Sequence, residues 1–208
     1  MAPGFLAVLS EPGNQVSLDE FQDWYNNEHV PLRLNHLLSF LSGARYRSID
    51  GIKPSWIAAY EIDDTKTFKD PSYTVLRQKR SEREKDVIER LEVLDRRICE
   101  VVREVDGLNG RTTGLRVGNP TQWVVTHGVG RPNGTAEINE EVGKWINEVI
   151  TKLENDSVKG WVKTTVLKVL ESGKTGTNLG LLNEEEQGGV LSHFVFHGES
   201  CLCAYTMN

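Results

Sequence analysis

The first half of the sequence alternates short apolar runs with amphipathic segments, which predicts strands and helices in turn. Two segments, Ser17-Leu-Asp-Glu20 and Ser81-Glu-Arg-Glu84, match the capping box that begins a helix. We expect the first helix to end at His29 or Val30, because Pro31 disfavours a helical conformation in the residue before it. The expected strands lie at residues 5–9, 44–49, 55–62 and 94–102. The resulting order, β-α-β-β-α-β, is that of a ferredoxin-like unit.

The second half repeats this order but stops early. We expect a strand, a helix and two further strands, at residues 122–129, 137–153, 161–170 and 190–197, with a polar loop at 172–189. Trp24 precedes Phe40 by 16 residues, and Trp145 precedes Trp161 by the same interval. Each pair spans the end of a helix and the approach to a strand, which is typical of an internal repeat.

These patterns predict an α+β protein built from tandem ferredoxin-like units in a dimeric α/β-barrel-type fold, with the second unit incomplete. The first unit covers residues 1–105. A linker rich in Gly, Asn and Thr covers residues 106–121, and the second unit covers residues 122–208.

The composition narrows the classes of function. The 208 residues include 24 basic and 30 acidic ones, which gives a net charge of -6. An acidic chain argues against general nucleic-acid binding, because that requires a basic surface. No apolar run approaches the roughly 18–20 residues of a membrane span, and three cysteines are too few for a disulfide framework. We expect a cytoplasmic protein with a small-molecule partner, and no nucleic-acid or membrane partner.

The first helix carries the most informative residues. Helical spacing gives its inward face six side chains: Phe21, Trp24, Tyr25, Glu28, His29 and Leu32. Desolvation disfavours a charged histidine there, whereas the helix C-terminus and a carboxylate favour it. A histidine subject to both effects can have a pKa near neutrality, which suits a general acid–base. The alternative is a core histidine that is hydrogen-bonded to the backbone.

Three segments together resemble the EthD-like branch of the dimeric α/β-barrel superfamily. They are Asp19-Glu-Phe-Gln-Asp-Trp-Tyr-Asn-Asn-Glu-His-Val-Pro-Leu-Arg33, Ser42-Gly-Ala-Arg-Tyr-Arg47 and Asp95-Arg-Arg97. The resemblance covers residues 4–104 well and residues 121–197 only in layout. It implies ferredoxin-like units whose sheets pair into a barrel, either between two chains or between two repeats of one chain. Relatives include cofactor-free cyclases, isomerases, decarboxylases and small monooxygenases, many of which act on polyketide or aromatic substrates.

The resemblance also implies a role for His29. In several relatives a histidine or aromatic residue near the first helix and the sheet transfers the proton, and His29 matches by position. The equivalent position in the second half is Ile150. We therefore expect one active pocket per chain, in the first unit.

Other side chains complete the expected site. We expect Tyr46 and Tyr60, on the second and third strands, to share a cavity with His29, where a phenol can donate to a developing enolate oxygen. Tyr46 is the second catalytic candidate. The substrate-binding candidates are Trp24, Tyr25, Glu28, Trp56 and Tyr60. Each of these residues has the alternative role of filling the core or the surface.

Several further groups are weaker candidates. Arg45 and Arg47 share the strand face opposite Tyr46, where solvent exposure or pairing is expected, although a substrate carboxylate could use one of them. A three-histidine metal cluster of His127, His193 and His197 lacks a supporting carboxylate. Cys201 and Cys203 form a C-x-C pair without a second pair of ligands. We expect no bound metal and no cofactor.

The sequence thus predicts a cofactor-independent cyclase, isomerase or lyase that acts on an apolar, polyketide-like or other secondary metabolite through His29. A homodimer is expected. The alternatives are a non-catalytic protein that binds or stabilises a metabolite, and a small oxygenase of the same superfamily. Phosphate-loop, dinucleotide, zincin and serine-hydrolase motifs are absent from the sequence.

Overall fold

The computed structural model describes residues 2–107, 112–132, 136–155, 160–178 and 190–200. The chain divides into two compact units. The first comprises Met1–Glu100 and Leu170–Leu182, and the second comprises Val101–Val169 and Asn183–Asn208. Two long strands, β4 (Val93–Asp106) and β6 (Trp161–Thr175), contribute residues to both units.

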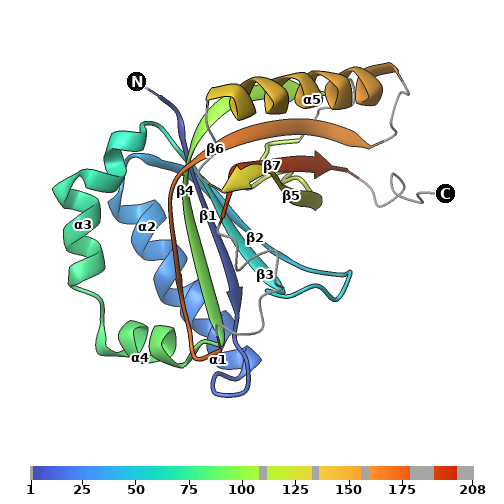
Figure 1. The fold of residues 1–208 in the computed structure, drawn as a ribbon. Helices are drawn as coiled ribbons and strands as arrows, with labels where there is room; N and C mark the ends of the chain where they lie inside the picture. Colours follow the sequence, from blue (N-terminus) through green and yellow to red (C-terminus); the bar gives the residue numbers. More distant parts are fainter. Residues whose placement is uncertain (1, 108–111, 133–135, 156–159, 179–189, 201–208) are drawn as a thin grey trace. The chain divides into compact units, whose positions relative to one another are not determined.

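The first unit has the predicted β-α-β-β-α-β order. Its elements are β1 (Gly4–Glu11), α1 (Leu18–Trp24), η1 (Tyr25–His29), α2 (Val30–His36), β2 (Phe40–Arg47), β3 (Trp56–Ile62), η2 (Thr65–Lys69), α3 (Pro71–Gln78), α4 (Glu82–Arg90) and β4. The strands pair in the order β2-β3-β1-β4, followed by the end of β6. Strands β1–β4 are antiparallel, and helices α1–α4 lie on one face of this sheet (Figure 1).

The first helix does not end at His29 or Val30, so that prediction is wrong. Residues Tyr25–His29 form a π-helical turn, in which the Val30 N–H bonds to the Tyr25 carbonyl, and α2 then continues to His36. In a regular α-helix the ring of Pro31 would collide with the carbonyl four residues earlier. The wider π-turn gives this ring room, so the helix passes through the proline.

The core of the first unit lies between the helices and the sheet. Side chains from alternate positions of the strands, including Leu6, Val8 and Tyr60, pack against Phe21 and Trp24 of α1. The period of two along a strand places every second residue on this helix side and the others on the opposite face. This separation decides which of the candidate residues meet.

The second unit contains β5 (Trp123–Pro132), α5 (Ala136–Asn155), β6 and β7 (Leu191–Glu199). Its strands follow β4 in the order β6-β7-β5, with antiparallel pairing of β7 to both of its neighbours. Helix α5 packs on one face through Val142, Ile146 and Ile150. No second helix or fourth strand is found in the part of this unit that the structure describes.

Strands β4 and β6 extend furthest beyond their predicted ends. Strand β4 continues to Asp106, and β6 continues through Ser172 and Gly173 to Thr175, where a loop was expected. Pairing explains the extension of β6, because neighbouring strands override the weak strand propensity of Ser and Gly. Beyond it, the Thr177 N–H still donates to the Leu91 carbonyl.

The prediction of an α+β fold with tandem ferredoxin-like units is confirmed. Among the described residues, no helix combines the length and apolar character needed to cross a membrane.

Candidate functional site

His29 lies at the end of the π-turn and bridges the first helix to α4. Its Nδ1 is 2.9 Å from Oε1 of Glu84. The carbonyl of His29 accepts a hydrogen bond from Nη1 of Arg33, 2.8 Å away. Both His29 and Glu84 are buried. The partner of His29 is therefore a carboxylate 55 residues away in the sequence.

The charges around this pair keep the imidazole neutral. Oε1 of Glu84 also lies 3.6 Å from Arg33 and 3.6 Å from Arg80. Burial, reinforced by the charge of Arg33, lowers the pKa of His29 to about 3, although Glu84 opposes this shift. Burial raises the pKa of Glu84, but its contacts with His29 and the two arginines outweigh that effect and bring its pKa below the usual value. A neutral His29 thus donates its Nδ1–H to an ionised Glu84.

Aromatic rings enclose His29. The ring centroids of Trp24 and Tyr25 lie 4.6 Å and 4.9 Å from that of the imidazole. The same core holds two buried polar atoms without a hydrogen-bond partner among the described residues, Trp24 Nε1 and Tyr60 Oη. Buried groups of this kind are few in native proteins, and each requires a role or a water molecule.

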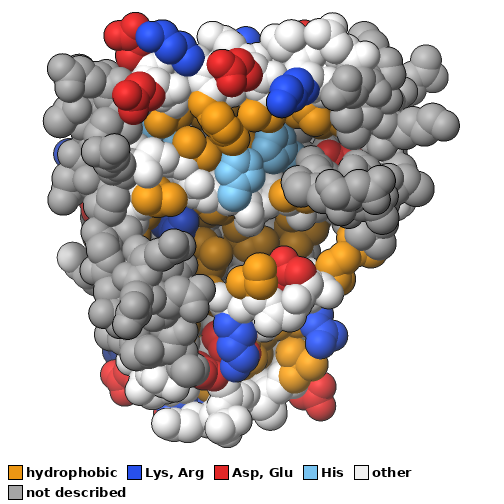
Figure 2. All heavy atoms as spheres, turned by 45° about the vertical axis from the view of Figure 1, so that its right-hand side comes forward, with side chains coloured by type: hydrophobic (Ala, Val, Ile, Leu, Met, Phe, Trp, Pro, Cys, Tyr) orange, Lys and Arg blue, Asp and Glu red, His pale blue; other side chains and the backbone are white. Residues whose placement is uncertain are grey.

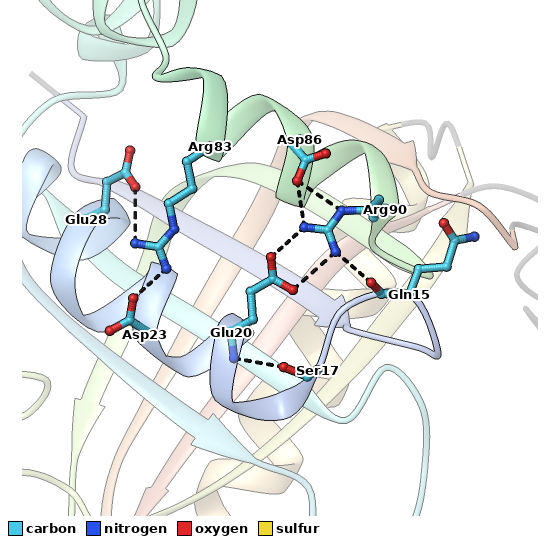
Figure 3. A network of polar contacts seen from close by, with 8 residues as sticks. All are labelled: Gln15, Ser17, Glu20, Asp23, Glu28, Arg83, Asp86 and Arg90. Atoms are coloured by element: carbon cyan, nitrogen blue, oxygen red, sulfur yellow. Dashed lines mark hydrogen bonds and ion pairs between the residues drawn. The ribbon is translucent and has the colours of Figure 1, made fainter.

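Glu28, which the helical spacing placed on the same inward face as His29, does not pair with it. The π-turn shifts the register, and Glu28 instead accepts a hydrogen bond from Ser81 and lies 3.9 Å from Arg83. The contact between Glu28 and Arg83 belongs to a polar network that ties the first helix to α4 (Figure 3). In the same network, Arg90 lies 2.5 Å from Glu20. Glu28 therefore helps to hold the two helices together.

Tyr46 lies on the opposite face of the sheet from His29, so the prediction of a shared cavity is wrong. Arg45, its neighbour on β2, donates to Gln22 of the first helix and lies 4.0 Å above the ring of Tyr25, which fixes Arg45 on the helix side. The alternation of side chains along a strand then turns Tyr46 to the other face. The prediction that Arg45 lies opposite Tyr46 and is paired is confirmed.

The sheet face that carries Tyr46 has small side chains at its centre. Ala44 of β2, Ala59 of β3 and Ala7 of β1 lie directly opposite one another, and the next residue in this row is Arg97 of β4. We call the three alanines the alanine row. No side chain in the alanine row is larger than a methyl group, and Ala7 and Ala59 are fully buried.

Polar and charged groups border the alanine row. On one side, Tyr46 belongs to a cross-strand row that ends at Asp95. Oδ2 of Asp95 lies 2.6 Å from Nη2 of Arg97 and 3.8 Å from Lys174, while Oδ1 has no partner among the described residues. On the other side, Glu61 accepts a hydrogen bond of 2.5 Å from Ser42. Burial, together with the charge of Glu61, raises the pKa of Tyr46 to about 12, so its phenol stays protonated at neutral pH.

The remaining substrate-binding candidates lie on the helix side. Tyr60 is fully buried there, and its ring fills the space above Gly43 of β2. The ring centroid of Trp56 lies 5.8 Å from that of Phe21 and 5.2 Å from the guanidinium carbon of Arg45. Together with Trp24 and Tyr25, these side chains form part of the core around His29. Their roles in substrate binding remain predictions.

The sequence reasoning missed three charged residues. Glu84 is visible there only as the last residue of a capping box, and no spacing links it to His29. Asp95 and Arg97 belong to the family resemblance, and as residues i and i+2 of one strand they share a face. Their position beside the alanine row depends on the register of β4.

Two of the three histidines in the second unit meet. Nε2 of His127 lies 3.1 Å from Nε2 of His197, whereas His193 interacts with Ser192. In the described part of the chain, no group of three or more His, Cys, Asp or Glu side chains is placed to hold a metal ion. Cys201 and Cys203 lie outside the described residues.

No family model matches the sequence, and no curated protein matches it. Among solved structures, the fold is similar to that of an anthrone oxidase-like protein, with a TM-score of 0.55 and 10% identity, covering 98% of this chain and 75% of that chain. This likeness shows the fold alone. Membership of the dimeric α/β-barrel superfamily and of its EthD-like branch remains a prediction. A provisionally named monooxygenase from Fusobacterium nucleatum subsp. nucleatum has a TM-score of 0.46 and 10% identity, covering 98% of this chain and 78% of that chain.

Proposed function

We propose that the protein is an enzyme that activates a flat, largely apolar and enolisable substrate on the Tyr46 face of the first unit. The alanine row is the observation that carries this proposal. It leaves the floor of the face without bulky side chains, and the Arg97–Asp95 pair borders it with a buried charge. Small-molecule sites commonly combine an apolar surface with a few polar groups that fix the orientation of the ligand.

Each polar group has a distinct role in this proposal. The phenol of Tyr46 donates a hydrogen bond to the substrate carbonyl, and the positive charge of Arg97 stabilises the oxygen as it becomes negative. Donors fixed in advance toward such an oxygen are among the strongest contributions to catalysis. Glu61 lies on the same face and is the carboxylate that accepts the proton from carbon.

The reaction class that follows is a cyclisation, isomerisation or elimination through an enolate, without a cofactor. In this scheme His29 does not take part in the proton transfer. Its neutral ring and its bond to Glu84 serve to hold the first helix against α4, rather than to contact a substrate bound near Tyr46. The version with His29 as the base remains testable, because no hydrogen bond to its Nε2 is found among the described residues.

Incubation with a panel of enolisable aromatic ketones in deuterated water tests the proposal. The expected result is faster exchange of the proton next to the carbonyl than in buffer alone, with part of this gain lost in the Arg97→Gln variant. Binding of a ketone without exchange or product would favour the alternative of a non-catalytic metabolite-binding protein. Circular dichroism confirms that the variant is folded.

A second candidate function is a small oxygenase, which the fold shared with the anthrone oxidase-like protein favours. An enolate also reacts with oxygen, so Tyr46, Arg97 and Glu61 would form the reactive species in this case too. Oxygen uptake distinguishes the two candidates when anthrone, an enolisable aromatic ketone, is the probe. Uptake in proportion to anthrone loss, above the spontaneous rate, supports the oxygenase. Proton exchange without uptake supports the cofactor-free isomerase, cyclase or lyase.

A further inference from the structure

The second unit contains a pair of histidines that the proposed function does not use. His127 of β5 and His197 of β7 are diagonal neighbours, because His197 lies directly opposite Val125. Their Nε2 atoms are 3.1 Å apart, and their rings are inclined by only 22°. His197 is buried, whereas His127 is partly exposed. Histidine side chains gather beside hydrophobic ones on the face drawn in Figure 2. We call His127 and His197 the imidazole pair.

Hydrogen bonds hold the rings of the imidazole pair, and for His197 the bonded atom is the nitrogen that faces away from its partner. Nδ1 of His197 lies 2.8 Å from Oγ1 of Thr164, and this oxygen also accepts a hydrogen bond of 3.0 Å from Trp161 Nε1. His127 is hydrogen-bonded to the backbone of Gly128. Histidines that ligate metals in proteins are typically oriented in this way, with the second ring nitrogen bound to an oxygen.

We propose that the imidazole pair binds one divalent metal ion of the Cu²⁺, Ni²⁺ and Zn²⁺ class through its two Nε2 atoms, with water completing the coordination. Two nitrogens that ligate one tetrahedral ion at about 2.0–2.1 Å lie about 3.3–3.4 Å apart. The observed separation of 3.1 Å is within a few tenths of an ångström of that value. A small swing of both rings therefore converts the hydrogen-bonded pair into a bidentate site.

The proton that must leave the two Nε2 atoms when the metal binds can stay on the imidazole of His197. The proton that the two Nε2 atoms share must leave before both can ligate a metal. His197 can move its proton to Nδ1 and donate it to Thr164, whose hydroxyl oxygen has two lone pairs and can accept from Trp161 as well. Metal binding then needs no net release of protons.

The ligand set determines the class of metal and its affinity. Imidazole nitrogens favour Cu²⁺, Ni²⁺ and Zn²⁺, whereas Mg²⁺ prefers oxygen ligands. A third protein ligand is absent among the described residues, so the affinity is expected to be micromolar. His193 lies on the same strand face four residues before His197 but outside the pair, which makes it a matched control.

Titration calorimetry with Zn²⁺, Ni²⁺, Cu²⁺ and Mg²⁺ tests the site. The chain carries Cys201→Ser and Cys203→Ser, so that thiols do not compete. The expected result is one ion of Zn²⁺, Ni²⁺ or Cu²⁺ per chain and no binding of Mg²⁺. The variants His127→Gln and His197→Gln should each weaken binding roughly tenfold or more, while His193→Gln should bind as the parent does. Absence of binding, or equal binding by all variants, overturns the proposal.

A second measurement does not depend on the variants being folded. Substoichiometric Cu²⁺ broadens the proton resonances of the imidazoles nearest to it in the nuclear magnetic resonance spectrum of the parent chain. Broadening of His127 and His197 before the other histidines supports the site. Broadening of His29, His36 or His193 first contradicts it.

Discussion

Lowering the pH should destabilise the native protein through His29, and the effect can be isolated by replacing that residue. The native pKa of His29 is lowered to about 3, mainly by burial, whereas an unfolded histidine has a pKa of about 6.5. Between these values the unfolded chain binds a proton at this position and the native chain does not. The stabilising contribution is thus fully present above about pH 6.5 and declines as the pH falls toward 3.

The size of the effect follows from proton linkage. Over this range a single group changes the free energy of unfolding by about 1.4 kcal/mol for each pH unit. Between pH 7 and pH 5 the loss from His29 is therefore about 2 kcal/mol. Both pH values lie well above the native pKa, so the result depends little on its exact value. Glu84, with its lowered pKa, loses its contribution only at more acidic pH.

Urea unfolding at pH 7 and pH 5 measures this difference. His29→Gln keeps a donor for Glu84 but cannot titrate, so its loss of stability between the two pH values should be smaller than that of the parent by about 2 kcal/mol. His36, exposed on the same helix, provides the control, and His36→Gln should keep the parental dependence. Coincident fluorescence and circular-dichroism transitions establish two-state unfolding. If His29→Gln loses as much stability as the parent, His29 is not held neutral in the native state.

Three further substitutions test the packing. Tyr60→Phe removes a buried hydroxyl without a partner among the described residues, so thermal unfolding should show a stability that is unchanged or higher by about 1 kcal/mol; a clear loss would reveal a hidden hydrogen bond. Asp95→Asn leaves the buried charge of Arg97 without its carboxylate and should cost about 3 kcal/mol in urea unfolding, whereas a neutral result would mean that the pair is solvated. Gly43→Ala places a methyl group 2.7 Å from the ring of Tyr60 and should lower the stability by about 1–3 kcal/mol. The control Gly173→Ala adds a methyl group that meets no atom within 4 Å and should not lower the stability. Equal losses of stability in the two variants would contradict the close packing of Gly43 against Tyr60.

The order of the elements could be predicted from the sequence because it depends on local signals. The two capping boxes begin helices where they were expected, with Ser17 and Ser81 accepting from the backbone of Glu20 and Glu84. The alternation of apolar residues also located every strand of the first unit. Strand ends were less well predicted, because the extension of β6 depends on its pairing partner rather than on its own residues.

The arrangement of the candidate site could not be predicted in the same way. The π-turn shifts the helical register by one residue and turns Glu28 away from His29, and no sequence rule used above anticipates it. The separation of Tyr46 from His29 depends on which strand face meets the helices. Likewise, Ala7, Ala44 and Ala59 are scattered through the sequence and form a row only through the strand register.

The central claim is that the Tyr46 face of the first unit, and not the core around His29, carries the chemistry. Proton exchange on an enolisable aromatic ketone, measured in parallel for Tyr46→Phe and His29→Gln, tests it most directly. The account predicts that Tyr46→Phe slows the catalysed exchange by about 100-fold, as the loss of one oxyanion donor does in other enzymes, while folded His29→Gln retains most of it. Loss of exchange in His29→Gln with full retention in Tyr46→Phe would contradict the account.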